Sequence, residues 1–450
     1  MSGFALDWTC PPLGFFAMSE SSSSAKTTTR PTLGHADRLL FGDLVISAGQ
    51  EEPERRVVES FISAVVQSEH LNLLVGSGLT TALGVAAQSG STANMTSALS
   101  TSDTTLDEAI EKAAVVSSTA AGRGSTPNVE DRLRVALAAQ VGLDFVADPR
   151  ADLLRAATGE ALTALRDSVA AIEAAIGAAP AQHPTDKASG PGPLITSFLN
   201  SLAGRVPTRD RLHLFTTNYD RVLEWGAELA GLRIVDRFVG SLEPVFRSSR
   251  LEIDYHYTPP GSPKEPRHLD GVVRLTKLHG SLDWQWRSKE RQVVRVPTAF
   301  GKSSTNDIAD LLIYPNAAKD FETTLYPYAD LFRDFSAAIC RPNATLVTYG
   351  YSLGDDHINR IIRDMLTIPS THLLIISFGD DGGRVTKFVN DYRLTGQVSL
   401  MLGPAFADLT RLTRDWLPRP ATSALTRAQT SILGATALSA ATTSGGATHV

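Results

Sequence analysis

Short apolar runs alternate with helix-like segments over much of the chain, and this alternation restricts the folds that it can adopt. Runs of strand length occupy residues 71–75, 212–217, 272–279, 344–350 and 371–378. The second, fourth and fifth of these runs are each followed by a segment with the apolar spacing of a helix. Strands that alternate with helices predict an α/β fold with a Rossmann-like, doubly wound parallel sheet. In such a sheet, ligands bind at the carboxyl ends of the strands.

The charge balance and the cysteine count exclude several classes of function. The 450 residues carry 42 basic and 48 acidic side chains, which leaves no basic excess that would favour nucleic acid. Cys10 and Cys340 are the only cysteines, too few for a disulfide framework or a four-thiolate zinc site. We therefore expect a cytoplasmic protein with no metal site and no direct nucleic-acid binding.

No part of the sequence predicts a membrane segment. The chain is 42% hydrophobic, which is enough to bury a sizeable core. No run, however, approaches the roughly 18 apolar residues of a membrane-spanning helix. The N-terminus also lacks the basic start of a secretory signal, so we expect no membrane association.

Composition divides the chain into two tails and one domain. Residues 19–32 are rich in serine and threonine, and the residues from 418 onward mix alanine, threonine and serine with weak periodicity. We predict a disordered leader at 1–36, a sheet-containing domain at 37–417 and a disordered tail at 418–450.

A mostly helical insertion is predicted at about 84–211. Residues 84–127 are poor in large apolar side chains and residues 177–193 are rich in glycine, proline and alanine, so both are interpreted as loops or a loosely packed lid. Residues 153–176 have helical periodicity. An apolar residue also recurs every four positions, at Val129, Leu133, Leu137 and Val141.

A polar segment follows each of four strand-like runs. The four are GSGLTT at 76–81, TTNYD at 216–220, KLHGS at 277–281 and GYSLGDDHIN at 350–359. In this order they resemble the NAD pocket of the sirtuin superfamily, and the resemblance extends from about residue 54 to residue 417. It implies NAD+ as the substrate and cleavage of the nicotinamide N-glycosidic bond.

The glycines of the first segment suit a phosphate-binding turn. They have no Cβ to block a dinucleotide pyrophosphate, and the N–H groups at the start of the next helix favour an anion. A tight strand-to-helix turn explains the same residues. The segment resembles the sirtuin loop Gly-Ala-Gly-x-Ser/Thr with serine in place of alanine, which implies that NAD+ contacts Gly76, Ser77, Gly78, Thr80 and Thr81.

The segment TTNYD supplies an amide and a carboxylate next to a strand end. It resembles the Thr-Gln-Asn-Ile-Asp segment of sirtuins and departs from it at Thr217 and Tyr219. The resemblance implies that Asn218 and Asp220 are catalytic, holding the nicotinamide ribose and positioning a water molecule. It also implies that Thr216 and Thr217 contact NAD+. Capping of the next helix is the alternative role for the amide or the carboxylate.

The segment KLHGS places His279 directly after an apolar strand. Histidine, with an unperturbed pKa near ~6.5, is the side chain most readily poised as a general base at neutral pH. A structural role is the alternative. The position of His279 fits the catalytic histidine of the sirtuin superfamily, which implies an interaction with the ribose hydroxyls.

The fourth segment resembles the Gly-Thr-Ser segment of sirtuins, which binds the ribose on the adenosine side. In its extended form it resembles the Gly-Tyr-Ser-x-x-Asp-x-x-Ile-x-x-Ile signature of prokaryotic sirtuin-like proteins. The resemblance implies that Gly350, Tyr351 and Ser352 bind the ribose on the adenosine side. We expect Asp355 and Asp356 to cap the following helix rather than to touch the ligand.

A further stretch, NVEDRL at 128–133, resembles the Asn-hydrophobic-Glu-Asp stretch common in the bacterial branch of the superfamily. A capped helix start explains these residues as well, because asparagine is favoured at an N-cap and acids are favoured in the first turn.

Two departures from the sirtuin pattern narrow the expected activity. Protein deacylases carry a zinc module of two cysteine pairs after the catalytic histidine, whereas Cys340 is the only cysteine there in this chain. The segment between Asn218 and His279 is also much longer than in the deacylases. Both departures place the acyl-lysine cleft in doubt and favour water as the acceptor.

The resemblance to bacterial anti-phage sirtuin-like NADases implies NAD+ glycohydrolysis, which gives nicotinamide and ADP-ribose, in an abortive-infection effector. Two alternatives stay open. One is a non-catalytic NAD or ADP-ribose binding module in a larger complex, and the other is a protein deacylase or ADP-ribosyltransferase.

Partners are implied by the same resemblance. Unregulated loss of NAD+ would kill the host, so the activity should be gated. We expect a homo-oligomer, or a separate activator such as a HerA-like ATPase or a short Argonaute.

Overall fold

The computed structural model describes residues 38–41, 44–47, 51–89, 98–120, 124–182, 189–205, 209–249, 253–258, 267–303, 311–313, 326–392 and 396–418. The predicted leader at 1–36 lies outside the described residues, and so does the predicted tail at 418–450 except for its first residue. The described residues all lie in one compact unit that extends from residue 35 onward.

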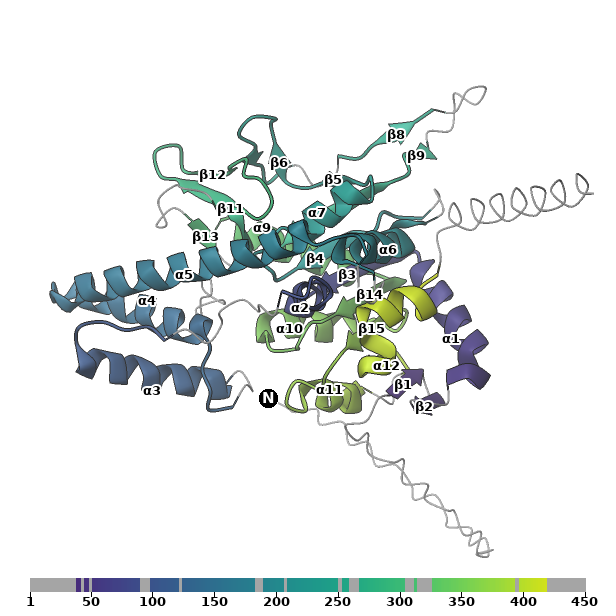
Figure 1. Ribbon diagram of the computed structural model, residues 1–450, viewed down its shortest axis with the longest axis horizontal. Coiled ribbons are helices and arrows are strands. Elements are labelled where there is room, and N and C mark those ends of the chain that lie inside the picture. Colours follow the sequence, from purple (N-terminus) through teal and green to yellow (C-terminus); the bar gives the residue numbers. More distant parts are fainter. Residues whose placement is uncertain are drawn as a thin grey trace, which may run out of the picture. The chain divides into compact units, whose positions relative to one another are not determined.

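A nine-stranded sheet organises this unit, in the order β2-β1-β16-β15-β14-β3-β4-β10-β5 (Figure 1). All neighbouring strands pair in parallel except at the β2–β1–β16 edge, where the pairing is antiparallel. The mixed α/β fold with a largely parallel sheet confirms the predicted fold class. The strands are β1 (Arg38–Phe41), β2 (Leu44–Ser47), β3 (His70–Val75), β4 (His213–Thr216), β5 (Arg233–Val235), β10 (Val272–Lys277), β14 (Ala344–Tyr349), β15 (His372–Ser377) and β16 (Val398–Leu402).

Six of these strands have the doubly wound order. When β3, β4, β10, β14, β15 and β16 are numbered one to six, their spatial order is 3-2-1-4-5-6. The chain therefore reverses its direction of travel across the sheet between β3 and β14, and such a switch point is where α/β sheets bind ligands. The sequence predicted the first five of these strands. It did not predict β16 or the edge strands β1, β2 and β5.

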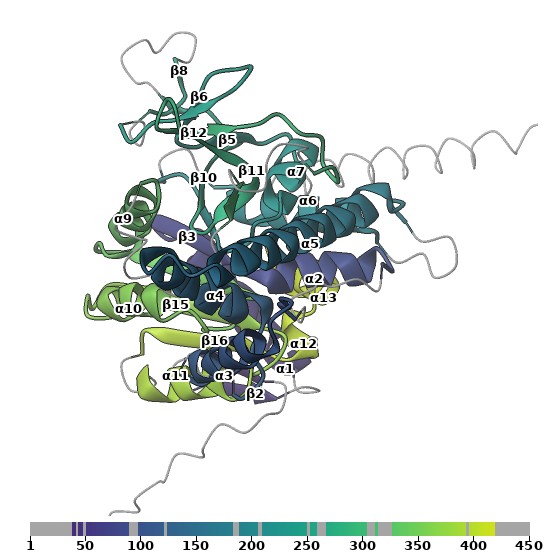
Figure 2. The ribbon, with the colours of Figure 1, turned by 90° about the vertical axis from the view of Figure 1, so that its left-hand side faces the viewer.

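Helices cover both faces of the sheet, which is why its strands are apolar almost throughout (Figure 2). One face carries α1 (Glu51–Val66), α2 (Ser77–Ala86), α6 (Pro191–Ala203) and α7 (Val222–Leu229), whose apolar side chains share one core with the strands. The other face carries α9 (Tyr328–Ile339), α10 (Asp356–Met365) and α11 (Arg384–Tyr392). There the rings of Phe215 and Phe335 meet edge to face, 4.9 Å apart.

The helical insertion contains α3 (Thr104–Ala120), α4 (Val129–Phe145) and α5 (Arg150–Ala178). The prediction of a loop or loosely packed lid at 84–127 is wrong for α3. That helix buries Leu106, Ile110, Ala114 and Ser118, which are spaced by four residues. Only two of them are large apolar side chains, so the low apolar content of the segment does not reveal this helical face. Asp103 caps its first turn.

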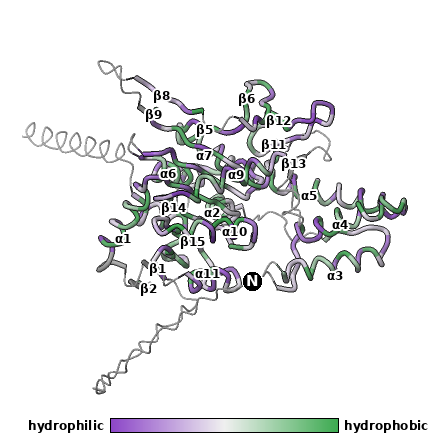
Figure 3. Tube along the Cα trace, turned by 180° about the vertical axis from the view of Figure 1, so that it is seen from behind, coloured by the Kyte–Doolittle hydropathy of each residue, from purple (hydrophilic) through white to green (hydrophobic). Residues whose placement is uncertain are grey.

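The apolar stripe predicted on α4 is only half buried. Four residues turn an α-helix by about 40° more than a full circle, so a strict four-residue repeat drifts around the helix. Val129 and Leu133 are buried, Ala136 continues their face, and Val141 is 70% exposed. Hydrophobic and hydrophilic residues accordingly alternate along α3, α4 and α5 (Figure 3).

The long segment between Asn218 and His279 contributes to a second, antiparallel sheet that the sequence did not predict. Its order is β13-β11-β12-β7-β6. Phe246 and Trp284 are buried within it, and Arg237 forms an ion pair with Asp334 of α9. The strands are β6 (Phe238–Val239), β7 (Val245–Phe246), β11 (Gly280–Arg287), β12 (Gln292–Arg295) and β13 (Leu311–Ile313), and a separate hairpin pairs β8 (His256–Tyr257) with β9 (Arg267–His268).

Candidate functional site

The four polar segments follow four strands that are direct neighbours in the sheet, in the order β14-β3-β4-β10. Tyr349, Val75, Thr216 and Lys277 are successive partners across these strands. Because the four strands are parallel, the segments emerge side by side at one edge of the sheet. The fold therefore brings together the segments that the sequence singled out, at the switch point of the sheet.

The glycines after β3 and β14 allow two loops to touch. Gly78 N–H donates to the carbonyl of Gly350 at 3.1 Å. A Cβ on Gly76 would lie 2.3 Å from that carbonyl oxygen, and one on Gly78 would lie 2.5 Å from the Cα of Gly350. Gly350 itself has φ +59. The close packing of the two loops therefore requires glycine at these positions. Binding of NAD+ by the same glycines stays a prediction.

Helix α2 begins directly at the first loop. Its N-cap is Gly76, no side chain caps the first turn and no acidic residue lies there. Ser77 and Thr81 are exposed, and Thr81 Oγ1 donates to the carbonyl of Ser77 at 3.1 Å. Thr80 is buried and faces the next strand. Thr80 and Thr81, both predicted to contact NAD+, are therefore in different environments.

A directed chain of hydrogen bonds links Asn218, Thr80 and Asp220. Asn218 Nδ2 donates to the carbonyl of Gly76 and to Thr80 Oγ1, both at 3.1 Å. Thr80 Oγ1 in turn donates to Asp220 Oδ2 at 2.6 Å. Because a carbonyl oxygen can only accept, this chain fixes which end of the Asn218 amide faces inward. Both amide hydrogens are used inside the protein.

Asp220 also has the capping role considered as an alternative. Its Oδ1 accepts from the N–H of Val222 at the start of α7, at 3.2 Å. Thr216 is buried and holds the loop: its hydroxyl donates to the carbonyl of Val75 and accepts from the N–H of Asn218. Thr217 is half-buried. A helix cap and a functional carboxylate are thus compatible in one residue.

His279 lies after β10 and is 8% exposed. Its Nε2 is 3.0 Å from Asp355 Oδ2, an ion-pair distance. The rings of Tyr219 and Phe332 are its aromatic neighbours, with centroids 6.4 and 6.5 Å away. Asp355 caps α10, as predicted, because its side chain accepts from the N–H groups of two residues in the first turn.

Tyr351 is turned into the protein and Ser352 is half-buried. The Tyr351 hydroxyl lies 3.0 Å from Asn359 Oδ1, and burial raises the pKa of this phenol well above its usual value. The carbonyl of Ser352 accepts from Arg384 Nε at 2.9 Å. Ligand contacts at Tyr351 would therefore fall on its backbone.

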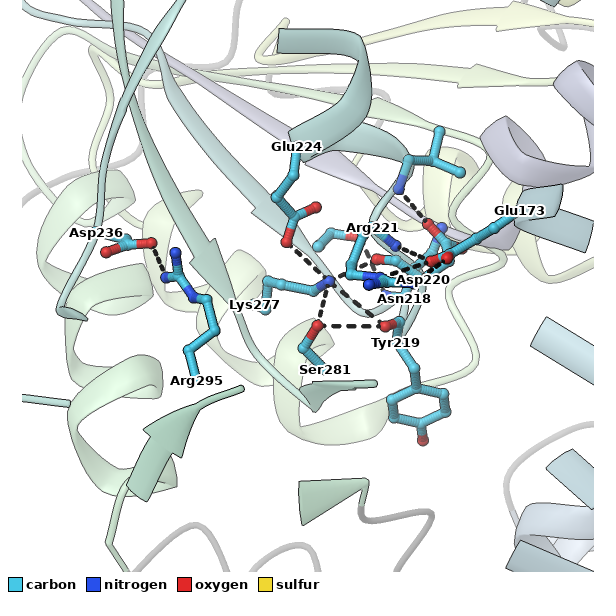
Figure 4. A network of polar contacts seen from close by, with 12 residues as sticks. Glu173, Asn218, Tyr219, Asp220, Arg221, Glu224, Asp236, Lys277, Ser281 and Arg295 are labelled. Atoms are coloured by element: carbon cyan, nitrogen blue, oxygen red, sulfur yellow. Dashed lines mark hydrogen bonds and ion pairs between the residues drawn. The ribbon is translucent and has the colours of Figure 1, made fainter. Parts of the chain in front are cut away.

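A buried lysine, which the sequence did not single out, holds the TTNYD loop (Figure 4). Lys277 is 2% exposed, and its Nζ donates to the carbonyl of Asp220, to Ser281 Oγ at 2.8 Å and to Glu224 Oε1 at 3.0 Å. Both Lys277 and Ser281 belong to KLHGS. The sequence pattern could have indicated their role, because Lys277 and Ser281 are polar residues two positions before and two positions after His279.

Two further connections join the helical insertion to the loop. Arg221 and Glu173 form a fully buried ion pair between the start of α7 and the long helix α5 (Figure 4). Tyr219 is buried among side chains of α3, α4 and α5, and its hydroxyl donates to Glu130 Oε1 at 3.1 Å. Burial raises its pKa well above the usual value. Tyr219 is one of the departures from the sirtuin pattern, and the insertion accounts for it.

The stretch NVEDRL is a capped helix start. Asn128 Oδ1 accepts from Asp131 N–H at 2.9 Å, and the Asp131 carboxylate accepts in return from Asn128 N–H at 3.1 Å. Asp131 is therefore occupied in the cap, whereas Glu130 reaches the TTNYD loop.

A family comparison agrees with this geometry. The family model of the SIR2-like domain matches residues 212–395. This part of the chain is similar to the SIR2-like domain. It includes Asn218, Asp220, His279 and Gly350, and it begins after the segment 76–81 and the helices α3 to α6. A SIR2-like domain implies an NAD-related activity. No curated protein sequence matches the chain significantly.

In the part of the chain that the structure describes, no group of three or more His, Cys, Asp and Glu side chains is arranged to hold a metal ion. No helix among the described residues is long and apolar enough to cross a membrane.

Proposed function

We propose that this protein is an NAD+ glycohydrolase that produces nicotinamide and ADP-ribose. The observation that carries the proposal is the convergence of the four polar segments at the carboxyl edge of neighbouring strands, three of them within the SIR2-like domain. Doubly wound sheets bind dinucleotides at such a place.

The reaction defines what the site must supply. The bond between nicotinamide and C1′ of the ribose breaks, and nicotinamide leaves with the bonding electron pair as a neutral ring. Positive charge develops on the ribose, as in glycoside hydrolysis. Water then adds to C1′ and loses a proton. The protein must orient the ribose, stabilise the positive charge and accept a proton.

The polar chain described above suits the first two tasks. The Asn218 amide hydrogens are used internally, so we assign its Oδ1 to the ribose or the attacking water. Asp220 is buried and ends the chain of hydrogen bonds. A carboxylate held in a water-poor site stabilises nearby positive charge more strongly than it would in bulk water.

We assign His279 as the group that accepts the proton, through the ribose hydroxyls or directly from water. For the phosphates we propose the start of α2, where backbone N–H groups and the absence of acids favour an anion. Gly350 and Ser352 are proposed to bind the adenosine-side ribose.

The test is incubation of the purified protein with NAD+ and detection of nicotinamide and ADP-ribose. His279→Ala should reduce turnover by at least about 10²-fold, because a general base contributes roughly that much or more. Asn218→Ala should be at least as damaging, because positioning is lost. His256→Ala, an exposed histidine of β8, is the matched control and should have wild-type turnover.

Each alternative has its own outcome in this assay. NAD+ binding without release of nicotinamide would favour a non-catalytic binding module. Release that depends on an acyl-lysine peptide or an acceptor protein would favour a deacylase or an ADP-ribosyltransferase. Wild-type turnover in folded His279→Ala protein would refute the catalytic assignment.

We further propose that the protein is a cytoplasmic abortive-infection effector of bacterial anti-phage defence, active as a homo-oligomer or with a separate partner such as a HerA-like ATPase or a short Argonaute. The defence role and the partner classes rest on the sequence resemblance alone. Gating is supported by the link between the helical insertion and the TTNYD loop at Tyr219, which offers a route by which assembly acts on the site. Turnover that is complete at every concentration of isolated monomer would contradict gating.

A further inference from the structure

We propose that Asp355 is a positioning residue for His279, with one carboxylate oxygen on the helix cap and the other on the imidazole. This inference rests on the proposed function. The sequence predicted only the cap, and the sheet brings the two residues together from separate strands.

The two oxygens of Asp355 have separate partners. Oδ1 accepts from the N–H groups of His357 and Ile358 at 3.0 and 3.4 Å. Oδ2 lies 3.0 Å from His279 Nε2. Both side chains are buried, with 7% of the Asp355 and 9% of the His279 side chain exposed. In a water-poor environment, such a charged contact is stronger than at the surface.

The backbone around Asp355 is held in place. Its carbonyl accepts from Asn359 N–H at 2.9 Å and lies 3.2 Å from the Tyr351 hydroxyl. Asn359 also donates from Nδ2 to the carbonyl of Leu353 at 2.8 Å. Tyr351 and Asn359 therefore hold the backbone of Asp355, and this positions the Asp355 carboxylate next to His279.

The ion-pair contact, in which Nε2 lies 3.0 Å from Asp355 Oδ2, favours one position of the proton on the His279 ring. A carboxylate only accepts, so it favours the proton on Nε2, the nitrogen that it faces. With the proton on Nε2, the lone pair lies on Nδ1, and we assign Nδ1 as the atom that accepts a proton in the reaction. The nearest aromatic rings are those of Tyr219 and Phe332, with centroids 6.4 and 6.5 Å from that of His279.

Asp355→Asn separates the two functions of the carboxylate. Asparagine is as good an N-cap as aspartate, so α10 should keep its cap. Its amide would, however, present a donor to Nε2 and favour the opposite tautomer. We expect turnover of NAD+ to fall at least about tenfold, and no further than in His279→Ala, because only the action of the base is lost. The loss should lie in kcat rather than in KM.

Asp103→Asn is the matched control, because Asp103 caps α3 through the same kind of bonds, to the N–H groups of Thr105 and Leu106. It should leave turnover unchanged. The double variant Asp355→Asn with His279→Ala should be no slower than His279→Ala alone, because the two residues act as a unit. Multiplied losses, or wild-type turnover in Asp355→Asn, would overturn the proposal.

A second measurement does not require activity. The ¹⁵N chemical shifts of the neutral His279 ring report its tautomer. We expect the proton on Nε2 in the wild type and on Nδ1 in Asp355→Asn. The same tautomer in both proteins would refute the positioning role. Absence of NAD+ cleavage by the wild type would instead count against the proposed function, and the two failures are thus distinguishable.

Discussion

Two buried polar groups meet at residues 216–221, and they differ in whether protein atoms alone satisfy their polar atoms. The clamp, Glu173 with Arg221, has protein partners on all sides: Glu173 also accepts from Gly301 N–H, and Arg221 also donates to the carbonyls of Thr298 and Lys302. The strand-end cluster, which we define as Thr80, Asn218, Asp220, His279 and Asp355, lies at the carboxyl edge of the sheet.

This difference separates stability from function. The clamp joins α5, the start of α7 and the loop at 298–302, so its charges are satisfied within the fold. In the strand-end cluster, the donors Asn218 Nδ2 and Thr80 Oγ1 orient the acceptor oxygens of Asn218 and Asp220. We assign these oxygens to the substrate. Both groups bury charged side chains, but we expect the clamp to stabilise the fold and the strand-end cluster to serve the reaction.

The largest effect on stability is expected from Glu173→Ala. The Arg221 charge would stay buried without its partner, and breaking such a pair typically costs about 3–5 kcal/mol of the free energy of unfolding. Urea unfolding of the variant measures this loss. By contrast, His279→Ala should unfold like the wild type and lose turnover instead.

Glu111→Ala is the control for the clamp. Glu111 pairs with Arg132 in the same helical insertion, but about half of its side chain is exposed. Its removal should cost no more than about 1 kcal/mol, as for other surface pairs. If Glu173→Ala were as mild as Glu111→Ala, the clamp would not be a stabilising element.

An intermediate effect is expected from Tyr219→Phe, which tests the connection between the insertion and the loop. The ring stays in its apolar cluster, and only the hydrogen bond to Glu130 is lost. A hydrogen bond to a charged group contributes about 1.5–3 kcal/mol, and partial exposure of Glu130 places the loss at the low end of that range.

Turnover by Tyr219→Phe should also fall, because Asn218 is the adjacent residue and its position depends on the loop. Steady-state kinetics and thermal unfolding of the same sample measure the two effects. The exposed Tyr255→Phe is the control. Full turnover in Tyr219→Phe would show that the insertion does not influence the strand-end cluster through this bond.

The smallest effect concerns the opposite edge of the sheet. Asp210 contacts His70, where β3 begins, and also Arg341. Burial tends to raise the pKa of Asp210, but Arg341 and the hydrogen bonds lower it below the usual value of an aspartate. A carboxylate with a lowered folded-state pKa stabilises the fold above its unfolded-state pKa, and this contribution is lost as pH falls through the folded-state pKa.

Asp210→Asn should therefore be less stable than the wild type at neutral pH, and the gap should narrow below about pH 3.8. Unfolding free energies over a pH series test this. A gap that is constant over the whole series would show that Asp210 acts without its charge. Turnover at neutral pH should be unchanged, in contrast to substitutions at the carboxyl edge.

The sequence predicted the parts of the fold that depend on local pattern. Five parallel strands, helices α7, α10 and α11 and the caps at Asn128 and Asp355 all follow from apolar spacing or capping preference. Helix α3 was missed because only two residues of its buried face, Leu106 and Ile110, are large apolar side chains, and the second sheet was missed because all of its strands except β11 are four residues or shorter.

The amino-acid sequence by itself determined which segments end at the carboxyl edge, because each polar segment directly follows its own strand. Only the tertiary structure decided that these four strands are neighbours and that His279 faces Asp355. It alone also decided that Tyr219 enters the core of an insertion far away in the sequence. Strand order and contacts between distant residues depend on which faces pack together, and no local pattern encodes that choice.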